Sequence, residues 1–295
     1  MKRWTQILLI LMAICLMLGI GFTISGLILG PSMEDIDRIL GGRDLTAAAQ
    51  TMRVEFDSDS LEKEWQALEE SGEIILYTSE KDGMEYEIPA QEIREMDISL
   101  TGDEVVFREC SGDRIRITVR GDREESIRVI TDGGKLLIRG KNQKLIQSKV
   151  PQVVVEYPGG MDFDAWNMQI GAGTADLEGD LTAAKFLAEI GAGECEIRGT
   201  VCCTDGTWTV GAGEIDADRI QGENLRFQCG LGEISAVLNG REEEYRYELH
   251  CGIGEIRIGD REYSGIAREA EDTGSGEKKI SADCGLGSIE LSFSA

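Results

Sequence analysis

The chain has 295 residues, of which 55 are Asp or Glu and 30 are Lys or Arg, so its formal net charge is −25. This excess of acid disfavours a nucleic-acid-binding protein, because such proteins neutralise phosphates with clustered Lys and Arg. It also disfavours direct adhesion of the folded chain to an anionic lipid surface.

An uncharged stretch near the N-terminus is long enough to cross a membrane. Residues 7–29 contain no charged side chain, and a helix of that length would measure about 35 Å, against about 30 Å for the hydrocarbon core. Lys2 and Arg3 precede it, and such a positive flank stays in the cytoplasm. We therefore predict a transmembrane signal anchor over residues 1–30. A cleaved signal peptide is the alternative, although its apolar core is usually shorter.

This orientation predicts a single-pass membrane protein with its C-terminal domain extracytoplasmic. Beyond Lys2 and Arg3 the chain carries 28 basic and 55 acidic residues, a net charge of −27. A domain of this charge attracts cations or basic partners.

Residues 31–91 are interpreted as a juxtamembrane stalk and a helical cap. Within them Asp59 and Glu62 resemble a capping box, and the apolar residues of 61–70 share one helical face. We expect this helix to cover one open end of the domain that follows, residues 92–295.

That domain begins with short segments in which apolar and polar residues alternate, separated by Gly- and Asp-containing turns. Alternation with a period of two predicts strands with one buried face. The apolar positions are Ile98, Leu100, Val105, Phe107, Ile115, Ile117, Val119, Ile127, Val129, Leu136, Ile138, Val153, Val155 and Tyr157.

A Gly-x-Gly phrase then recurs six times, flanked on both sides by alternating residues. The first glycines are spaced by 20, 20, 19, 22 and 33 residues, and a fixed period near 20 is typical of a stack of similar coils. We interpret these glycines as structural turns, where a Cβ atom would collide with the coil above. They are Gly171, Gly173, Gly191, Gly193, Gly211, Gly213, Gly230, Gly232, Gly252, Gly254, Gly285 and Gly287.

The pattern predicts an all-β fold, a right-handed single-chain parallel β-solenoid of about 20 residues per coil, behind one N-terminal transmembrane helix. Equivalent residues of successive coils should form ladders in the core, such as Ile170, Ile190, Val210, Cys229, Cys251 and Cys284 in chain order. No phrase extends to G-x-G-x-x-G or ends in Gly-Lys-Ser/Thr, so we reject nucleotide binding and expect no cofactor.

An acidic residue follows four of the six phrases, and these residues should stack as a column: Glu194, Glu214, Glu233 and Glu255. Carboxylates about 5 Å apart repel by about 0.8 kcal/mol in water. Either they extend into solvent or a cation lies between them, and calcium suits oxygen ligands.

The remaining reactive residues suggest no catalytic centre. Cys202-Cys203 lacks a second pair for zinc, and the lone His250 is out of phase with the buried residues. Trp166 and Trp208 fall at buried positions, which argues against a carbohydrate-active β-helix enzyme, although that alternative stays open.

The lead-in strands, the segment 153–160 (Val-Val-Val-Glu-Tyr-Pro-Gly-Gly) and the Gly-x-Gly coils resemble the bacterial "putative adhesin" family, β-strand-repeat domains of unknown function. The similarity covers roughly residues 92–293. Membership implies a right-handed β-solenoid, a cell-envelope location and no established catalytic residue.

We therefore expect a non-enzymatic, membrane-anchored envelope protein that displays an acidic β-solenoid for adhesion or for envelope-stress interactions with a protein or glycan partner. Calcium-stabilised display and carbohydrate-active catalysis are the alternatives. The last strand ends beside Ala295, so we also expect either the insertion Gly259 to Lys279 to cover an open C-terminal end or two chains to meet there.

Overall fold

The computed structural model describes residues 83–122, 126–140, 150–264 and 276–294, together with the backbone of 73–74, 78–80 and 268–271. The chain divides into two compact units, Met1–Leu45 and Thr46–Ala295, and all described residues belong to the second. The predicted anchor over 7–29 and the predicted helix over 61–70 lie outside these residues. Within the described part, no helix is long and apolar enough to span a membrane.

The described residues form nineteen strands and two short 3₁₀ turns, so the all-β prediction is confirmed. The early elements are β1 (Glu73–Ile74), β2 (Thr78–Glu80), β3 (Gly83–Pro89), η1 (Ala90–Glu92), β4 (Glu95–Leu100), β5 (Glu104–Cys110), β6 (Arg114–Arg120), β7 (Ile127–Asp132), β8 (Lys135–Gly140) and β9 (Gln152–Pro158). The later ones are β10 (Asp162–Glu178), β11 (Leu181–Gln221), β12 (Asn224–Cys229), β13 (Glu233–Asn239), η2 (Glu242–Glu244), β14 (Tyr245–Cys251), β15 (Glu255–Ile258), β16 (Arg261–Ser264), β17 (Arg268–Glu271), β18 (Lys278–Cys284) and β19 (Ser288–Ser294). Strand β3 lies before residue 92, in the span where we expected the stalk.

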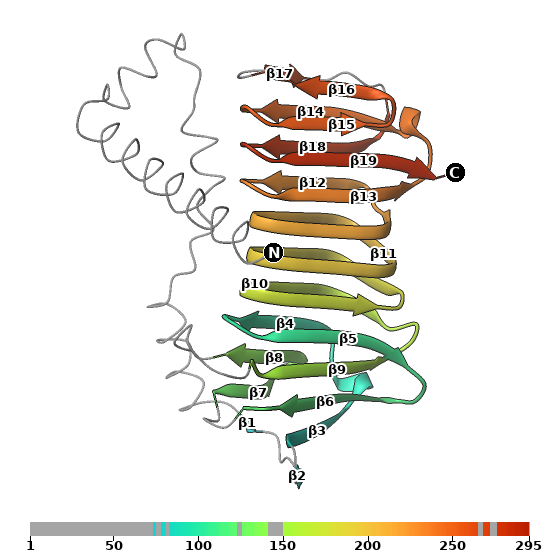
Figure 1. Cartoon of the computed structure of the whole chain (residues 1–295). Helices are drawn as coiled ribbons and strands as arrows, with labels where there is room; N and C mark the ends of the chain where they lie inside the picture. Colours follow the sequence, from blue (N-terminus) through green and yellow to red (C-terminus); the bar gives the residue numbers. More distant parts are fainter. Residues whose placement is uncertain are drawn as a thin grey trace, which may run out of the picture. The chain divides into compact units, whose positions relative to one another are not determined.

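The strands are arranged in two rows that face each other across the apolar core (Figure 1). The first row runs β1-β7-β8-β4-β10-β11-β12-β18-β14-β17. The second runs β2-β3-β6-β9-β5-β10-β11-β13-β19-β15-β16. Strands β10 and β11 belong to both rows because the chain continues through the Gly-x-Gly turn without a break in pairing. We define a coil as one first-row strand followed by the second-row strand that it leads into.

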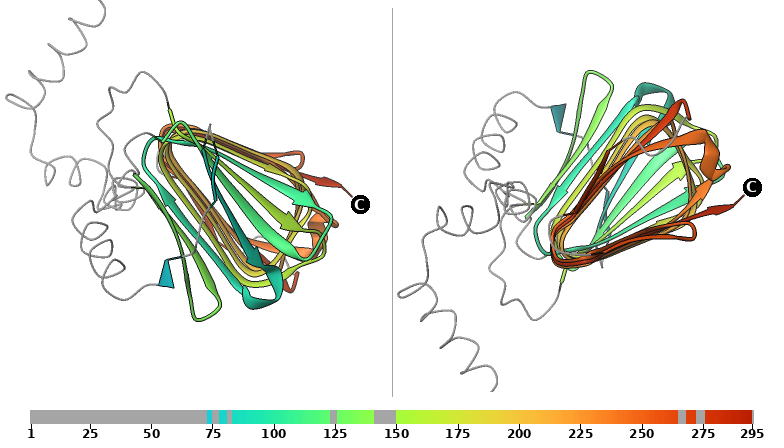
Figure 2. Two further views of the ribbon diagram at one scale, coloured as in Figure 1. Left: turned by 90° about the horizontal axis from the view of Figure 1, so that it is seen from below. Right: turned by 90° about the horizontal axis from the view of Figure 1, so that it is seen from above.

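The middle coils stack in sequence order. Strands β10 and β11 pair in parallel with a constant offset of 20, which places Ile170 beside Ile190 and Thr174 beside Glu194. A Cβ atom added to Gly213 would lie against the carbonyl oxygen of Gly193, so the next coil continues the same stack. Seen along the stack, these coils superpose (Figure 2). Residues about twenty positions apart are therefore neighbours, as the spacing predicts.

The C-terminal coil, β18 with β19, departs from sequence order. Strand β18 pairs with β12 on one side and with β14 on the other, and β19 pairs likewise with β13 and β15. The last coil of the chain therefore lies inside the stack, and the predicted core ladder must be corrected so that Cys284 stands between Cys229 and Cys251. The physical reason is the long insertion before β18, which lets the chain pass the outer coil and return.

That insertion covers the end of the stack. Strand β16 pairs antiparallel with β15, and β17 pairs antiparallel with β14. The covered end is thus formed by β14 and β15, and not by the final strand as we expected. Unpaired edge strands recruit other chains, so an antiparallel cover removes an aggregation site.

The opposite end repeats this arrangement. The coil of β4 and β5 lies between β10 and the later coil of β8 and β9, although it precedes both in the chain. Antiparallel β7 and β6 then pair with β8 and β9. At each end, therefore, two coils that are consecutive in the chain are separated in the stack by a third coil, which comes from an earlier or a later part of the sequence.

The core consists of the alternating apolar residues, and every buried position predicted from the sequence is buried. Trp208 is fully buried and stacks on Phe227 of the next coil, with ring centroids 5.1 Å apart. Across the core, Trp166 of the first row meets Phe107 of the second at 5.2 Å. Full burial of one large apolar side chain stabilises the fold by roughly 1.5–3 kcal/mol.

Close approach explains the second glycine of each phrase. A Cβ atom on Gly193, Gly213 or Gly232 would lie far inside van der Waals contact with the backbone carbonyl oxygen of the coil below. A φ in the region that favours glycine occurs at Gly173 and Gly193 but not at Gly213. Close stacking of the coils is therefore the reason for glycine that all copies of the phrase have in common.

Candidate functional site

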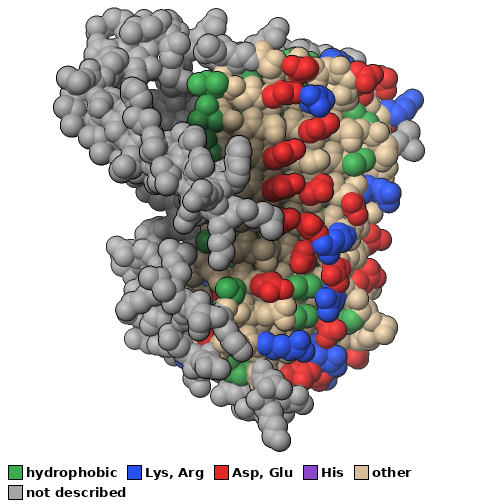
Figure 3. Space-filling model, viewed as in Figure 1, with side chains coloured by type: hydrophobic (Ala, Val, Ile, Leu, Met, Phe, Trp, Pro, Cys, Tyr) green, Lys and Arg blue, Asp and Glu red, His purple; other side chains and the backbone are tan. Residues whose placement is uncertain are grey.

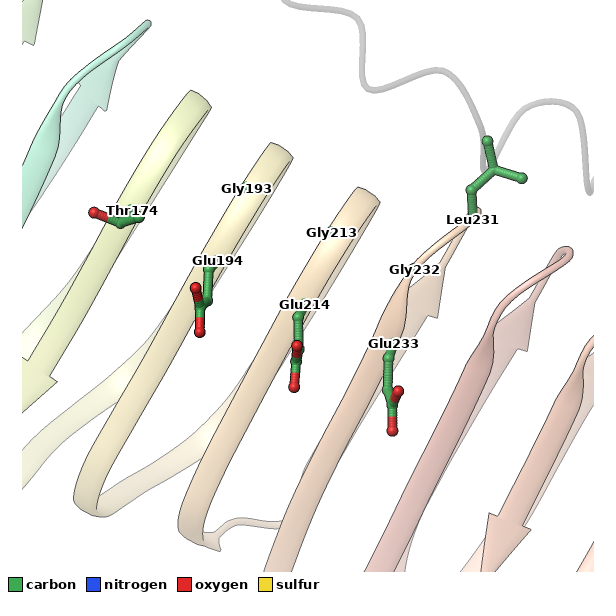
Figure 4. Close-up of a pocket in the computed structure, with 8 residues that line it drawn as sticks. All are labelled: Thr174, Gly193, Glu194, Gly213, Glu214, Leu231, Gly232 and Glu233. Atoms are coloured by element: carbon green, nitrogen blue, oxygen red, sulfur yellow. The ribbon is translucent and has the colours of Figure 1, made fainter. Parts of the chain in front are cut away.

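The candidate site is a shallow acidic groove on the second row of strands, directly after the Gly-x-Gly turns. It has a volume of about 580 Å³. Its lining residues, shown in Figure 4, are Thr174, Gly193, Glu194, Gly213, Glu214, Leu231, Gly232 and Glu233. Three successive coils therefore each contribute one carboxylate to the same groove.

The local sequence explains why these carboxylates point outward. Each glutamate precedes a buried residue of its strand, Cys195, Ile215 or Ile234, and period-two alternation places it on the opposite face. Their backbones are in register, since Thr174 pairs with Glu194 and Glu214 with Glu233. In Figure 4 the three side chains extend side by side in one direction.

The carboxylates of Glu194, Glu214 and Glu233 are exposed and repeat at the strand spacing, about 4.8 Å. Among the described residues, no Lys or Arg forms an ion pair with any of these three glutamates. The groove therefore concentrates negative charge that the described part of the fold leaves unneutralised.

The predicted column of four glutamates needs one correction. Ser288 of the C-terminal coil pairs with Glu233 on one side and with Glu255 on the other. Glu255 is thus two coils away from Glu233, and it pairs instead with Arg257, whose Nη2 donates to its Oε1 at 2.6 Å. The acidic row contains three glutamates, with Thr174 at one end and Ser288 at the other.

Within the described ranges, no three His, Cys, Asp or Glu side chains converge closely enough to hold a metal ion. Parallel carboxylates on neighbouring strands point away from the fold instead of toward a common centre. A calcium column at Glu194, Glu214 and Glu233 stays a prediction.

An apolar ridge borders the groove. The middle residues of three phrases are exposed large side chains on adjacent coils: Leu231 (57% exposed), Leu286 (47%) and Ile253 (64%). Leu231 also lines the groove itself. Figure 3 shows the acidic side chains gathered in a column on this face of the molecule.

A second, smaller depression was not found from the sequence. It has a volume of about 280 Å³ and lies across the β11, β12 and β18 strands of the first row. Its two basic side chains already form ion pairs. The Nη1 of Arg226 lies 3.7 Å from the Oδ2 of Asp283, and the Nζ of Lys279 lies 2.5 Å from the Oε2 of Glu248. No sequence pattern indicated it, because Lys279 neighbours Asn224 through the displaced C-terminal coil.

The remaining candidate residues lie where the alternation predicted. Trp166 and Trp208 are fully buried, so neither offers a platform for a sugar ring. His250 is partly exposed on the outer surface, and its Nε2 lies 3.7 Å from the Oε1 of Glu248. Cys229, Cys251 and Cys284 are buried and free, on three adjacent coils.

One buried acid was not anticipated. Asp103 is 1% exposed, and its Oδ1 atom has no hydrogen-bond partner. Burial raises the pKa of its carboxyl from 3.8 to about 6. Its carbonyl accepts a hydrogen bond from Thr174, so Asp103 occupies the place of the second glycine in the β4/β5 coil.

Comparison with known proteins gives structural neighbours but no sequence relatives. No protein-family model matches the chain, and no curated protein matches it. A "putative cell adhesion protein" from Clostridium sporogenes aligns with 72% of this chain and 100% of its own, at 10% identity and a TM-score of 0.44.

A "putative adhesin" from Bacteroides fragilis aligns with 72% of this chain and 98% of its own, at 14% identity and a TM-score of 0.33. Another from Parabacteroides distasonis aligns with 70% and 97%, at 11% identity and 0.37. These descriptions agree with the family that the sequence resembles. Their TM-scores are below 0.5, so the arguments that follow rest on this chain's own residues.

Proposed function

We propose that this chain is a non-enzymatic, membrane-anchored envelope protein whose β-strand stack displays a repetitive acidic surface to a basic, extended partner. The partner class is a cationic peptide segment or polymer with charges repeated along its length. The observation that carries the proposal is the row of Glu194, Glu214 and Glu233, three exposed carboxylates in register along one groove.

The scaffold suits display. We propose that the described coils form a right-handed parallel β-solenoid, and two features support this: the 20-residue register and the Gly-Gly contacts between coils. Each coil contributes side chains at fixed spacing, so a surface motif is repeated without any dedicated loop. A partner with regular charges can then make the same contact several times, which increases its total affinity.

Electrostatics favours a basic partner over calcium alone. The three carboxylates point in one direction, while calcium needs six to eight oxygens around it. The chain beyond residue 3 carries a net charge of −27, which would steer cationic polymers toward the surface. The neighbouring Leu231 adds an apolar contact at the edge of the groove.

Anchoring is part of this proposal. Residues 7–29 would hold the chain in a bacterial cell membrane, with Lys2 and Arg3 inside and the acidic domain outside. Deleting residues 7–29 should move the protein from the membrane fraction to the soluble fraction. If the full-length protein is found in the soluble fraction, the anchor is refuted.

The binding experiment uses the full chain in detergent micelles and a fluorescent oligolysine peptide. The triple variant Glu194→Gln, Glu214→Gln, Glu233→Gln should weaken binding by about tenfold, since each exposed contact contributes up to about 0.5 kcal/mol. The matched control changes three scattered exposed acids, Asp164→Asn, Asp218→Asn and Glu243→Gln, with the same change in net charge.

Equal weakening by the two triple variants would show that net charge alone attracts the peptide, and the groove would lose its role. Salt should weaken binding to the wild type more steeply than binding to the groove variant. Depolymerisation of an envelope glycan that is abolished by Glu214→Gln would instead establish the enzyme alternative and overturn the proposal.

A further inference from the structure

Three cysteines form a short column in the core of the stack. Cys284 of β18 pairs in register with Cys229 of β12 on one side and with Cys251 of β14 on the other. Neighbouring strands are about 4.8 Å apart, within the Cα–Cα range of about 4.4–6.8 Å that a disulfide spans. The displaced C-terminal coil sets the order within this column, because chain order alone would place Cys251, and not Cys284, beside Cys229.

The thiols lean toward the next coil of the stack. A Cβ atom on Gly287 would lie 2.6 Å from the Sγ of Cys229, and one on Gly254 would lie 2.7 Å from the Sγ of Cys284. Gly254 and Gly287 therefore leave the space that these two sulfur atoms occupy. The Sγ of Cys229 thus points into the C-terminal coil that carries Cys284.

The Sγ of Cys229 donates a hydrogen bond to the carbonyl oxygen of Gly232 at 3.0 Å. The neighbouring Cys284 lowers the pKa of the Cys229 thiol, and Cys229 in turn raises the pKa of Cys284. Burial raises the pKa of Cys251 to about 11. In the docked stack Cys229 is therefore the most acidic thiol of the column.

We propose that Cys229 and Cys284 form a disulfide that fastens the C-terminal coil into the stack, while Cys251 stays a thiol. The inference rests on the proposed extracytoplasmic location, since disulfides persist in oxidising compartments. The C-terminal coil is synthesised after both of the coils between which it lies. A covalent bond would retain it there without depending on strand pairing alone.

The chemistry is an exchange with an external disulfide, such as that of a thiol–disulfide oxidoreductase or oxidised glutathione. The thiolate of one of the two cysteines attacks one sulfur of the oxidant, which forms a mixed disulfide and releases the first thiolate. The thiolate of the other cysteine then attacks the first cysteine's sulfur and releases the second. The two cysteines lose two protons and two electrons, and the oxidant is reduced to two thiols.

Burial determines when this exchange takes place. Cys229 is 0% exposed and Cys284 is 3% exposed, so an oxidant cannot reach them in the folded stack. The bond must form before the C-terminal coil docks fully, and once formed it is shielded from reductants. Oxidation should therefore accompany folding.

The chain allows a direct test by peptide mapping. Trypsin cleavage after Arg and Lys places the three cysteines in different peptides, 227–241, 247–257 and 280–295. The full chain, in detergent micelles, is refolded from denaturant in a buffer of reduced and oxidised glutathione, quenched with acid, alkylated and digested. We expect peptide 227–241 linked to peptide 280–295, with the Cys251 peptide alkylated.

Matched variants identify the pair. Cys251→Ser should keep the link, Cys229→Ser should remove it, and Cys195→Ser serves as a control, because Cys195 pairs with Ala175 and has no stacked cysteine. Three alkylated peptides in the refolded wild type would overturn the proposal. A link from 247–257 to 280–295 would equally overturn the assigned pair.

Membrane fractions quenched with acid separate this inference from the proposed function. A link in cells supports both. If the link forms in the glutathione buffer but is absent from cells, the pairing holds and the extracytoplasmic location is wrong. Wild type refolded in reducing buffer should melt several degrees below oxidised wild type, whereas Cys229→Ser should melt at the same temperature after either treatment.

Discussion

The middle and the ends of the stack follow different rules, although both are built from the same alternating strands. In β10 and β11 each coil lies on the one before it, with Ile170 beside Ile190. At each end one coil lies between two coils that follow one another in the chain. A constant coil length enforces sequential stacking, whereas the long connection before β18 permits another order.

The two regions also differ in the direction of their strand pairing. The middle coils have parallel partners on both sides, while the strands beyond the last coil at each end are antiparallel. These strands are β7, β1, β6, β3 and β2 at one end and β16 and β17 at the other. An antiparallel strand that returns over the last coil satisfies backbone groups that a further parallel coil would otherwise need to pair.

Removing the C-terminal coil should have the largest effect. Deleting residues 278–295 leaves β12, β13, β14 and β15 each without one partner, so we expect loss of the cooperative thermal transition, together with aggregation. Circular dichroism melting and size-exclusion chromatography measure this outcome. A soluble, cooperatively melting truncation would mean that this coil is peripheral and that the inserted order is wrong.

A single methyl group tests the close contact in the middle. Gly193→Ala places Cβ against the carbonyl oxygen of Gly173, and it also requires alanine at φ +147°. We expect a loss of about 3–5 kcal/mol in the free energy of unfolding, measured by urea titration. The destabilised variant should also lose the backbone hydrogen bonds that join the coil of Gly193 to the coils on its two sides.

Gly112→Ala is the matched control. Gly112 has a similar φ of +139°, but a Cβ atom there would meet nothing within 4 Å. Conformational strain alone should cost about 1–3 kcal/mol. If both substitutions cost the same, contact between coils is not the reason for glycine in the phrase.

Asp103 marks the boundary between the regular coils and the inserted β4/β5 coil. Because burial raises its pKa to about 6, the folded state binds the proton more tightly than the unfolded state does. The ionised carboxylate therefore lowers stability above pH 6, and this penalty disappears as the pH falls below about 4.

Asp103→Asn should thus raise the free energy of unfolding at pH 7.5 by up to about 3 kcal/mol and change it little at pH 4. Urea titrations of both proteins across this pH range give the difference directly. Destabilisation by the substitution at pH 7.5 would show that the carboxylate makes a favourable interaction in the fold.

Deleting Glu262–Glu277 should change the melting temperature least of these alterations but should alter association. It removes most of β16 and all of β17, and so exposes the outer edges of β14 and β15. We expect dimers or larger species in light scattering. A monomer would leave the covering role of this insertion without support.

Alternation was the most reliable signal in the sequence. It identified the buried residues on both rows, from Ile98 to Leu291, because strand side chains must alternate between core and solvent whatever the strand pairs with. For the same reason it predicted that Glu194, Glu214 and Glu233 are exposed. The period near 20 then predicted their register, since these coils are 20 and 19 residues long.

The order of the coils at the two ends could not be predicted from the sequence. Ser288 separates Glu233 from Glu255, and Cys284 separates Cys229 from Cys251. Spacing along the chain gives the length of each coil. It does not determine which strand edges a coil pairs with after a long connection. The buried Asp103 was missed for a related reason, because its environment is formed by distant segments.

The sequence by itself therefore determined the all-β class, the inward and outward faces, and the acidic row of the middle coils, since these depend on local periodicity. Tertiary structure alone decided which coils are neighbours at the two ends. Backbone hydrogen bonding there can be satisfied by several strand orders, and packing of the complete stack selects one. That selection places Cys284, and not Cys251, beside Cys229.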